Sequence, residues 1–317
     1  MITRTDIQDA AQRIATHVRH TPVIELEKDA FGINAKIFFK LECLQHAGSF
    51  KPRGAFNCIL SSQIPEAGVI AASGGNHGAA VAYAAQKLGH HAEIFVPNPT
   101  PANKINRLRQ YGATINLAGK NYSEALAASC ERAAQTGALP IHAYDDNRVL
   151  AGQGTLAMEF EEQAGGLDSV LIAVGGGGLI GGAAAWFQGK TRIISVEPEC
   201  APTLHNSLIT GHVVDVETSG VASDSLGARR AGELMFPLAQ KFIAQSVLVT
   251  DDQIVNAQKV LWQSLRLIAE PGGATAFAAL LAGVYKPQSG ERVGVVLCGS
   301  NADLAKFPAD ASASATS

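Results

Sequence analysis

A lysine among small residues is the first group in this chain that could do covalent chemistry. Lys51 follows Gly48, Ser49 and Phe50 and precedes Pro52, a pattern that predicts a loop leading into a helix. Most lysines lie on solvated surfaces, but a lysine framed this tightly can be partly buried, and burial lowers the pKa of an amine. A neutral amine is a nucleophile that can form an imine with an aldehyde. Lys51 is therefore a candidate catalytic residue, with a solvent-exposed lysine as the alternative.

A glycine-rich loop, Ser73-Gly74-Gly75-Asn76-His77-Gly78, lies between an apolar strand and an expected helix. Its backbone N–H groups and the positive end of the helix converge on one point, which favours an anion such as a phosphate or a carboxylate. Asn76 adds an amide that can hydrogen-bond a ring substituent. The alternative is a turn eased by glycine and capped by Ser73. A histidine such as His77, taken alone, more often packs in a turn than catalyses.

Four consecutive glycines form a second candidate anion site. Gly175, Gly176, Gly177 and Gly178 follow an expected strand and open a helix, so no side chain obstructs their N–H groups. Gly176, Gly178 and Gly181 also satisfy the G-x-G-x-x-G spacing, and Glu197 ends the next strand, where a ribose-binding acid would fall. A nicotinamide-dependent oxidoreductase is therefore an alternative, although it leaves Lys51 and the loop 73–78 unexplained.

Cys298 opens the run Cys-Gly-Ser-Asn directly after an expected strand. The carboxyl edge of a parallel sheet is where α/β enzymes bind ligands, so this thiol is a further candidate. A buried inert thiol is the alternative. Glu270-Pro271-Gly272-Gly273 marks a helix break with a carboxylate beside it, which alone indicates little.

Alternating helical and strand periods must position these groups, and they predict an α/β fold with mostly parallel sheets flanked by helices. Thr5 is the expected N-cap of a first helix. The other expected helices are 79–88, 102–111, 123–136, 154–163, 179–187, 251–269 and 274–281. The expected strands are 36–41, 69–72, 92–96, 113–117, 169–174, 192–196 and 292–297. The tail 309–317 is rich in Ala and Ser, and we expect it to fray.

Composition excludes several classes of protein. The 317 residues are 47% hydrophobic and 17% charged, which excludes intrinsic disorder, and a net charge of -3 provides no field that would recruit nucleic acid or an anionic membrane. No apolar run approaches the ~20 residues of a membrane helix, and the N-terminus lacks a signal-peptide core. Five widely spaced cysteines suggest neither a disulfide framework nor a zinc site. We therefore expect a cytoplasmic protein.

Together and in this order, Ser-Phe-Lys-Pro-Arg-Gly, Ser-Gly-Gly-Asn-His-Gly, the four glycines and Cys-Gly-Ser-Asn resemble the serine/threonine dehydratase branch of the tryptophan synthase β-like pyridoxal phosphate (PLP) enzymes, known as fold type II. The resemblance spans roughly residues 7–304. Pro52-Arg53-Gly54-Ala55 favours the dehydratases, because Asp-Arg commonly follows the lysine in cysteine and threonine synthases. The resemblance implies two lobes: a large PLP-binding domain formed by 1–67 and 146–317, and a small domain, 68–145, that closes over the substrate.

The same resemblance implies residue roles. Lys51 would form the imine with PLP and remove the substrate's α-proton, and Phe50 would pack beside the cofactor ring. Asn76 would bind the ring's 3-hydroxyl and Cys298 would face its pyridine nitrogen. The phosphate would be held by Gly175, Gly176, Gly177 and Gly178. The substrate carboxylate would be held by Ser73, Gly74, Gly75, Asn76 and His77, with Ser73 and Lys51 as the catalytic candidates.

The implied reaction is β-elimination of a 3-hydroxy amino acid to a 2-oxo acid and ammonia. A neutral thiol at the pyridine nitrogen makes the cofactor a weaker electron sink, which favours elimination. In related serine racemases a second serine follows the loop's first serine and acts as an acid and base. Gly74 stands there in this chain and can neither donate nor accept a proton, so we expect slow racemisation.

The family also has a cation site, whose spacing Glu197, Ala201 and Thr203 fit. Divalent-binding members carry Asp where Thr203 stands, so a monovalent cation such as K⁺ fits better than Mg²⁺ or Ca²⁺. The alternative is that Glu197 caps a helix. We expect a homodimer, because members commonly are homodimers.

L-Threonine and L-serine are the default amino acid substrates. 3-Hydroxyaspartate would need an extra cation near the pocket, and phenylserine would need a roomy apolar pocket. A non-catalytic protein that retains the fold and binds a cofactor or an amino acid is the third hypothesis, beside the dehydratase and the oxidoreductase.

Overall fold

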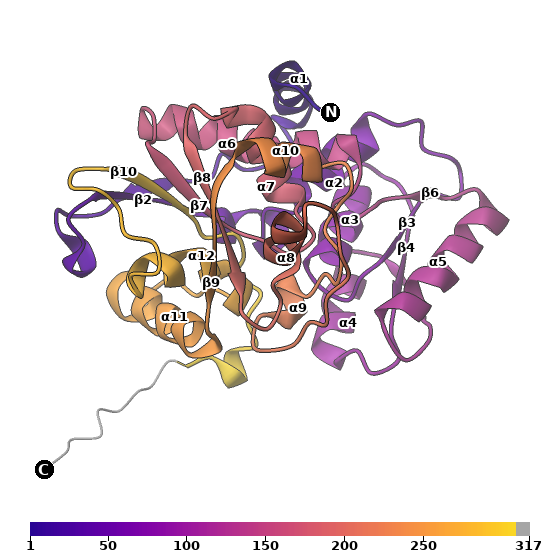
Figure 1. Cartoon of the computed structure of the whole chain (residues 1–317). Coiled ribbons are helices and arrows are strands. Elements are labelled where there is room, and N and C mark those ends of the chain that lie inside the picture. The colour runs from indigo at the N-terminus through magenta and orange to yellow at the C-terminus, as the bar shows by residue number, and fades with distance from the viewer. Residues whose placement is uncertain (309–317) are drawn as a thin grey trace, which may run out of the picture.

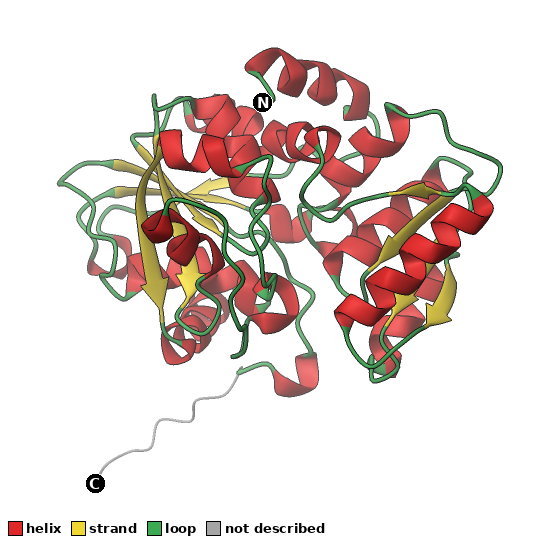
Figure 2. Ribbon diagram, turned by 45° about the vertical axis from the view of Figure 1, so that its right-hand side comes forward, coloured by secondary structure: helices red, strands yellow, loops and turns green. Residues whose placement is uncertain are grey.

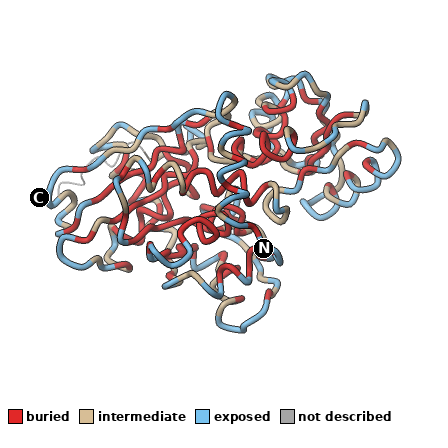
Figure 3. The backbone as a smooth tube through the Cα atoms, turned by 90° about the horizontal axis from the view of Figure 1, so that it is seen from above, coloured by how far each residue is buried: buried red, intermediate tan, exposed pale blue. Residues whose placement is uncertain are grey.

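Two sheets, each with its own helices, make up the computed structural model, which describes residues 1–308 (Figures 1 and 2). The expected fraying of 309–317 lies outside the described residues. Buried residues concentrate in the sheets and in the helices packed against them (Figure 3). Within 1–308, no helix is both long enough and apolar enough to cross a membrane.

The larger sheet has six strands in the order β1-β2-β10-β7-β8-β9. All neighbouring strands are parallel except the antiparallel pair β1 and β2. The central strands are apolar and buried on both faces, as is typical of parallel sheets covered by helices. Helices α6 and α7 pack on one face and α11 and α12 on the other (Figure 1). The strands are β1 Val23–Glu25, β2 Lys36–Lys40, β7 Ser169–Ala173, β8 Arg192–Pro198, β9 Ile243–Val249 and β10 Arg292–Val296.

The smaller sheet has four parallel strands in the order β5-β4-β3-β6. Its strands are β3 Val69–Ala72, β4 Ala92–Val96, β5 Thr114–Leu117 and β6 Leu139–Pro140. Its helices are α3 Asn76–Lys87, α4 Ala102–Gln110 and α5 Tyr122–Thr136. Helix α2, Pro52–Leu60, packs its apolar side chains into the core of this sheet, although it precedes β3 in the chain. The expected α/β class with mostly parallel sheets is confirmed, while the domain boundaries at 67/68 and 145/146 stay predictions.

The remaining helices belong with the larger sheet. They are α1 Arg4–Ile14, α6 Asn147–Ala164, α7 Gly178–Phe187, α8 Thr203–Thr210, α9 Ser223–Leu226, α10 Phe236–Phe242, α11 Asp251–Leu265 and α12 Pro271–Leu281. Short 3₁₀ helices span Ala30–Gly32, Glu42–Leu44, His46–Gly48 and Leu304–Lys306.

Several elements differ from the expected ones. Thr3, rather than Thr5, caps α1, because Thr3 and Asp6 form a reciprocal capping box. Helix α6 begins seven residues earlier than expected and contains Gly152 and Gly154, residues that disfavour a helix on propensity alone. Tight packing explains them: a Cβ added at Gly152 would lie 2.5 Å from the Arg53 carbonyl oxygen. Gly152 therefore lets α6 approach α2, which carries Lys51 at its N-cap, whereas Gly154 lets α6 approach Ile7 of α1 and Gly182 of α7.

Candidate active site

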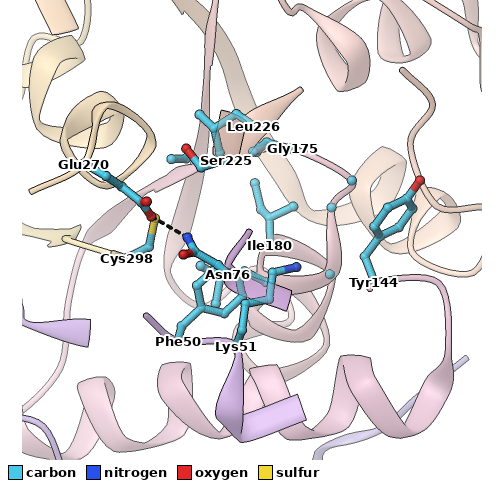
Figure 4. Close-up of a pocket in the computed structure, with 16 residues that line it drawn as sticks. Phe50, Lys51, Asn76, Tyr144, Gly175, Ile180, Ser225, Leu226, Glu270 and Cys298 are labelled. Atoms are coloured by element: carbon cyan, nitrogen blue, oxygen red, sulfur yellow. Dashed lines mark hydrogen bonds between the residues drawn. The ribbon is translucent and has the colours of Figure 1, made fainter. Parts of the chain in front are cut away.

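Most of the candidate residues meet in one pocket at the carboxyl ends of the central strands (Figure 4). The pocket encloses about 470 Å³, part of it open to solvent. The sequence-predicted residues that line it are Phe50, Lys51, Asn76, Gly175, Gly176, Gly177, Gly178 and Cys298. Tyr144, Ser225, Leu226 and Glu270 line it as well, although the sequence motifs do not indicate such a role for them.

Lys51 lies at the N-cap of α2, and its side chain extends into this pocket (Figure 4). Its Nζ donates a hydrogen bond to the Ala143 carbonyl oxygen at 2.9 Å. Burial lowers the pKa of Lys51 to about 8, although Cys298 and Glu270 nearby act in the opposite direction. Roughly a tenth of this amine is therefore neutral at pH 7, far more than for an ordinary lysine, and the neutral form is the state a nucleophile or a base needs.

The four glycines form a cradle between the end of β7 and the start of α7. Gly177 is the N-cap of α7 and has a left-handed φ of 93°, which strains any residue with a Cβ. A Cβ at Gly176 would lie 2.2 Å from the Tyr144 ring. Only glycine fits at these positions, and the result is a bare backbone surface at a helix N-terminus, which is suited to an anion.

Asn76 is held by a chain of side-chain hydrogen bonds. Its Nδ2 donates to Glu270 Oε1 at 2.5 Å, and its Oδ1 accepts from Asn301 Nδ2 at 2.7 Å. Burial raises the pKa of Glu270 to about 7, while the bond from Asn76 and the charge of Arg107 act to lower it. Glu270 therefore titrates near neutral pH inside the pocket. Its position at the start of α12, directly before Pro271, was the only signal of it in the sequence.

Cys298 remains a neutral thiol. Its Sγ donates a weak hydrogen bond to the Gly272 carbonyl oxygen at 3.4 Å, and burial raises its pKa well above that of an ordinary cysteine. A group facing this sulfur meets an uncharged partner rather than a carboxylate.

The loop before α3 lies beside the pocket rather than in its lining. Ser73 Oγ accepts a hydrogen bond from the Gly75 N–H at 3.2 Å. His77 lies in the first turn of α3, where its Nε2 bonds with the Ile141 carbonyl oxygen at 2.9 Å. Burial lowers the pKa of His77 to about 3, so this ring stays neutral. The side chain of His77 therefore packs against the smaller sheet. Only its backbone N–H can take part in an anion site with the backbone of Gly74 and Gly75.

Glu197 lies away from these groups, at the end of β8. Its carboxylate accepts the N–H groups of Leu204 and His205 at 2.7 Å each, so it caps α8. Ala201 lies just before α8 and Thr203 is the first residue of α8, where the Thr203 hydroxyl donates to the Ala228 carbonyl oxygen. An acid engaged in this way is not free to bind a ribose, which counts against the oxidoreductase alternative. The cation site at these residues stays a prediction.

Comparisons with known proteins agree with this arrangement. The family model described as "Pyridoxal-phosphate dependent enzyme" matches residues 14–299. The L-threonine ammonia-lyase of Geobacter sulfurreducens is 38% identical, over 96% of this chain and 77% of that protein. The phenylserine dehydratase of Ralstonia pickettii is 37% identical, over 93% of this chain and 92% of that protein.

A solved structure, that of maize serine racemase, superposes with a TM-score of 0.90 at 33% identity and covers 96% of this chain and 94% of that one. Both the sequence and the arrangement of the pocket thus lead to one family. The chain belongs to the pyridoxal phosphate-dependent enzymes of fold type II, in their serine/threonine dehydratase branch.

Proposed function

We propose that this chain is a PLP-dependent dehydratase, or ammonia-lyase, that converts a 3-hydroxy amino acid such as L-threonine or L-serine to a 2-oxo acid and ammonia. One observation carries the proposal: the buried amine of Lys51, with its pKa lowered to about 8, shares a pocket with the cradle of four glycines. The dehydratases among the relatives described above support the reaction class.

The residues of the pocket fit PLP. The backbone N–H groups of the four glycines suit the phosphate. Phe50 and Asn76 line the pocket beside Lys51, where the cofactor ring would lie. The neutral thiol of Cys298 suits an unprotonated pyridine nitrogen. When bound, PLP supplies an electron sink that weakens the bonds at the substrate's α-carbon. The protein's part is to orient the substrate and to move protons.

In our proposal, Lys51 takes the α-proton, because its lowered pKa of about 8 makes the neutral amine accessible near neutral pH and because it lies in the pocket. The N–H groups of the loop 73–77 hold the substrate carboxylate, with the Ser73 hydroxyl as the second catalytic group. Gly74 offers no acid or base, so racemisation of L-serine should be slow beside ammonia release. Closure of residues 68–145 over the substrate would exclude water from the site.

We propose three further properties: a cytoplasmic location, a homodimer and a K⁺ site. The five cysteines are free, which is compatible with a cytoplasmic location. We propose a homodimer because members of the family are commonly homodimers. Glu197, Ala201 and Thr203 lie along the connection from β8 to α8, which supports a K⁺ site there. Ammonia release measured with K⁺ and with Mg²⁺ tests the cation proposal, and K⁺ alone should activate.

The test of the proposed function is a 2-oxo acid and ammonia release assay of the holoenzyme with serine, threonine, 3-hydroxyaspartate and phenylserine stereoisomers. Lys51→Ala should lower the rate by roughly 10²- to 10⁴-fold or more and remove the visible absorbance near ~410 to 420 nm. Lys36→Ala, which removes an exposed lysine, should change neither. Bound PLP with no 2-oxo acid from any of these substrates would instead indicate a binding protein.

A further inference from the structure

Helix α4 of the smaller lobe begins beside the substrate loop and carries two cations on one face. A Cβ added at Gly74 would lie 3.1 Å from Thr100 Cγ2, which places the start of α4 against this loop. Lys104 and Arg107 follow on α4 and are three residues apart, so they lie on the same side of the helix. Positive charge therefore lies near the place where a substrate would bind.

Helix α9 of the larger lobe lies across from α4. Lys104 Nζ forms an ion pair with Asp224 on α9, which brings the two helices together across the lobes (Figure 1). The Asp224 carbonyl oxygen would lie 3.6 Å from a Cβ on Gly75, and the next residue, Ser225, lines the pocket of Lys51. The Lys104–Asp224 pair thus bridges the lobes beside both the substrate loop and the cofactor pocket.

Arg107 has no such partner. Within residues 1–308, its guanidinium makes neither an ion pair nor a hydrogen bond, and its Nε is buried without a partner. The side chain as a whole is half-buried. Leaving a buried donor of this kind unsatisfied is costly, and such a group often awaits a ligand.

Among the residues that the structure describes, no acid forms an ion pair with Arg107. Asp224 is taken by Lys104, and Glu270 accepts a hydrogen bond from Asn76 and forms no ion pair with Arg107. Burial lowers the pKa of Arg107, and the charges of Glu270 and Asp224 act to raise it, which agrees with a place beside the pocket mouth. An anion that arrives with the substrate would complete the arrangement.

We propose that Arg107 binds a second carboxylate of the substrate, and that the preferred substrate is a 3-hydroxy amino dicarboxylate, of which 3-hydroxyaspartate is the smallest. This inference rests on the proposed function, in which the N–H groups of the loop 73–77 take the α-carboxylate. A guanidinium is the side chain best suited to bind the remaining carboxylate with two parallel hydrogen bonds. An aryl side chain would leave the guanidinium of Arg107 unpaired.

The test is the ratio of kcat/KM for ammonia release from 3-hydroxyaspartate to that from L-serine, measured on the holoenzyme. The wild type should prefer 3-hydroxyaspartate, and Arg107→Ala should lower this ratio by roughly 10- to 100-fold, the effect of losing a charge-assisted hydrogen bond. Arg107→Lys should retain part of the preference. Arg109→Ala removes an exposed arginine of the same helix and should leave the ratio as it is.

A binding measurement supplements the rates. Succinate and butyrate are four-carbon acids that differ by one carboxylate, and each is measured as a competitor of L-serine. Succinate should inhibit the wild type more strongly, and Arg107→Ala should remove the difference between the two inhibitors. The visible absorbance of each variant reports whether the cofactor is bound, so a folding defect is recognised.

Two failures are distinguishable. Ammonia from L-serine or L-threonine but none from 3-hydroxyaspartate, or an unchanged ratio in Arg107→Ala, would overturn this inference and leave the proposed function in place. No ammonia from any of the three substrates with PLP bound would overturn the proposed function, and the inference with it.

Discussion

Charge is buried in two neighbouring regions of this protein, and the segment Phe50–Arg53 joins them. On one side, Arg53 pairs with Glu42 at 2.7 Å and with Glu159 at 2.9 Å, and all three are buried or nearly so. On the other side, the half-buried Lys51 and the buried Glu270 lie in the active-site pocket, and neither forms an ion pair within residues 1–308. A single residue, Pro52, separates the paired cation Arg53 from the unpaired Lys51.

The pKa values follow the pairing. Burial alone would lower the pKa of Arg53 and raise that of Glu42, but their ion pair outweighs burial and shifts each in the opposite direction. Without an ion pair, burial dominates, so the pKa of Lys51 falls to about 8 and that of Glu270 rises to about 7. The buried ion pair keeps Arg53 and Glu42 charged and anchors α2. Lys51 and Glu270 lack an ion pair, so they exchange protons near neutral pH.

The largest expected effect is on the paired side. Glu42→Gln leaves Arg53 with one acid in place of two, and breaking a buried ion pair typically costs about 3 to 5 kcal/mol of stability. Urea unfolding of the holoenzyme at pH 7 measures this loss. Glu217→Gln, which removes an exposed acid paired with Arg229, should cost less than about 1 kcal/mol. Equal losses in the two variants would show that the buried pair does not anchor the fold.

The same chemical change on the unpaired side should have the opposite sign. The folded pKa of Glu270 is raised from 4.5 to about 7, so its stabilising contribution is full below pH 4.5 and is lost as the pH rises through 7. In the cofactor-free protein, Glu270→Gln should therefore be the more stable form at pH 8, by up to roughly 3 kcal/mol. Urea unfolding at pH 4.5 should show no such gain. A loss of stability at pH 8 would contradict the comparison.

A smaller effect is expected in the kinetics of cofactor binding. The rate at which PLP forms an imine with the cofactor-free protein should rise about tenfold per pH unit and level off near pH 8, where the Lys51 amine becomes neutral. Stopped-flow absorbance follows this reaction. A rate that keeps rising toward 10.5, the ordinary pKa of lysine, would mean that Lys51 is not desolvated.

Much of the site could be predicted from the sequence, because its groups lie in continuous motifs. Each of these motifs can be recognised from its own short stretch of sequence, without knowledge of the fold. The groups concerned do meet in one pocket: Lys51, Asn76, the four glycines and Cys298. Glu270 and Arg107 could not be predicted in the same way. Their roles depend on contacts between distant segments, such as the bond between Asn76 and Glu270, which lie 194 residues apart.

The fold shows the same division. Strands β7 and β10 are continuous apolar runs and were predicted within a residue or so, because burial on both faces leaves a clear pattern. The edge strands β1 and β9 and the short helices α8, α9 and α10 were not predicted. Strand β9 is partly exposed and mixes polar with apolar residues, so its pattern alone does not indicate a strand.

The central claim is that the ε-amino group of Lys51 carries the cofactor. Borohydride reduction of the holoenzyme, followed by digestion and peptide mass analysis, tests this claim directly. The account predicts a phosphopyridoxyl group on the peptide that contains Lys51 and none on peptides with exposed lysines such as Lys36. A modification at another lysine, or an unmodified Lys51 in protein that retains PLP, would contradict it.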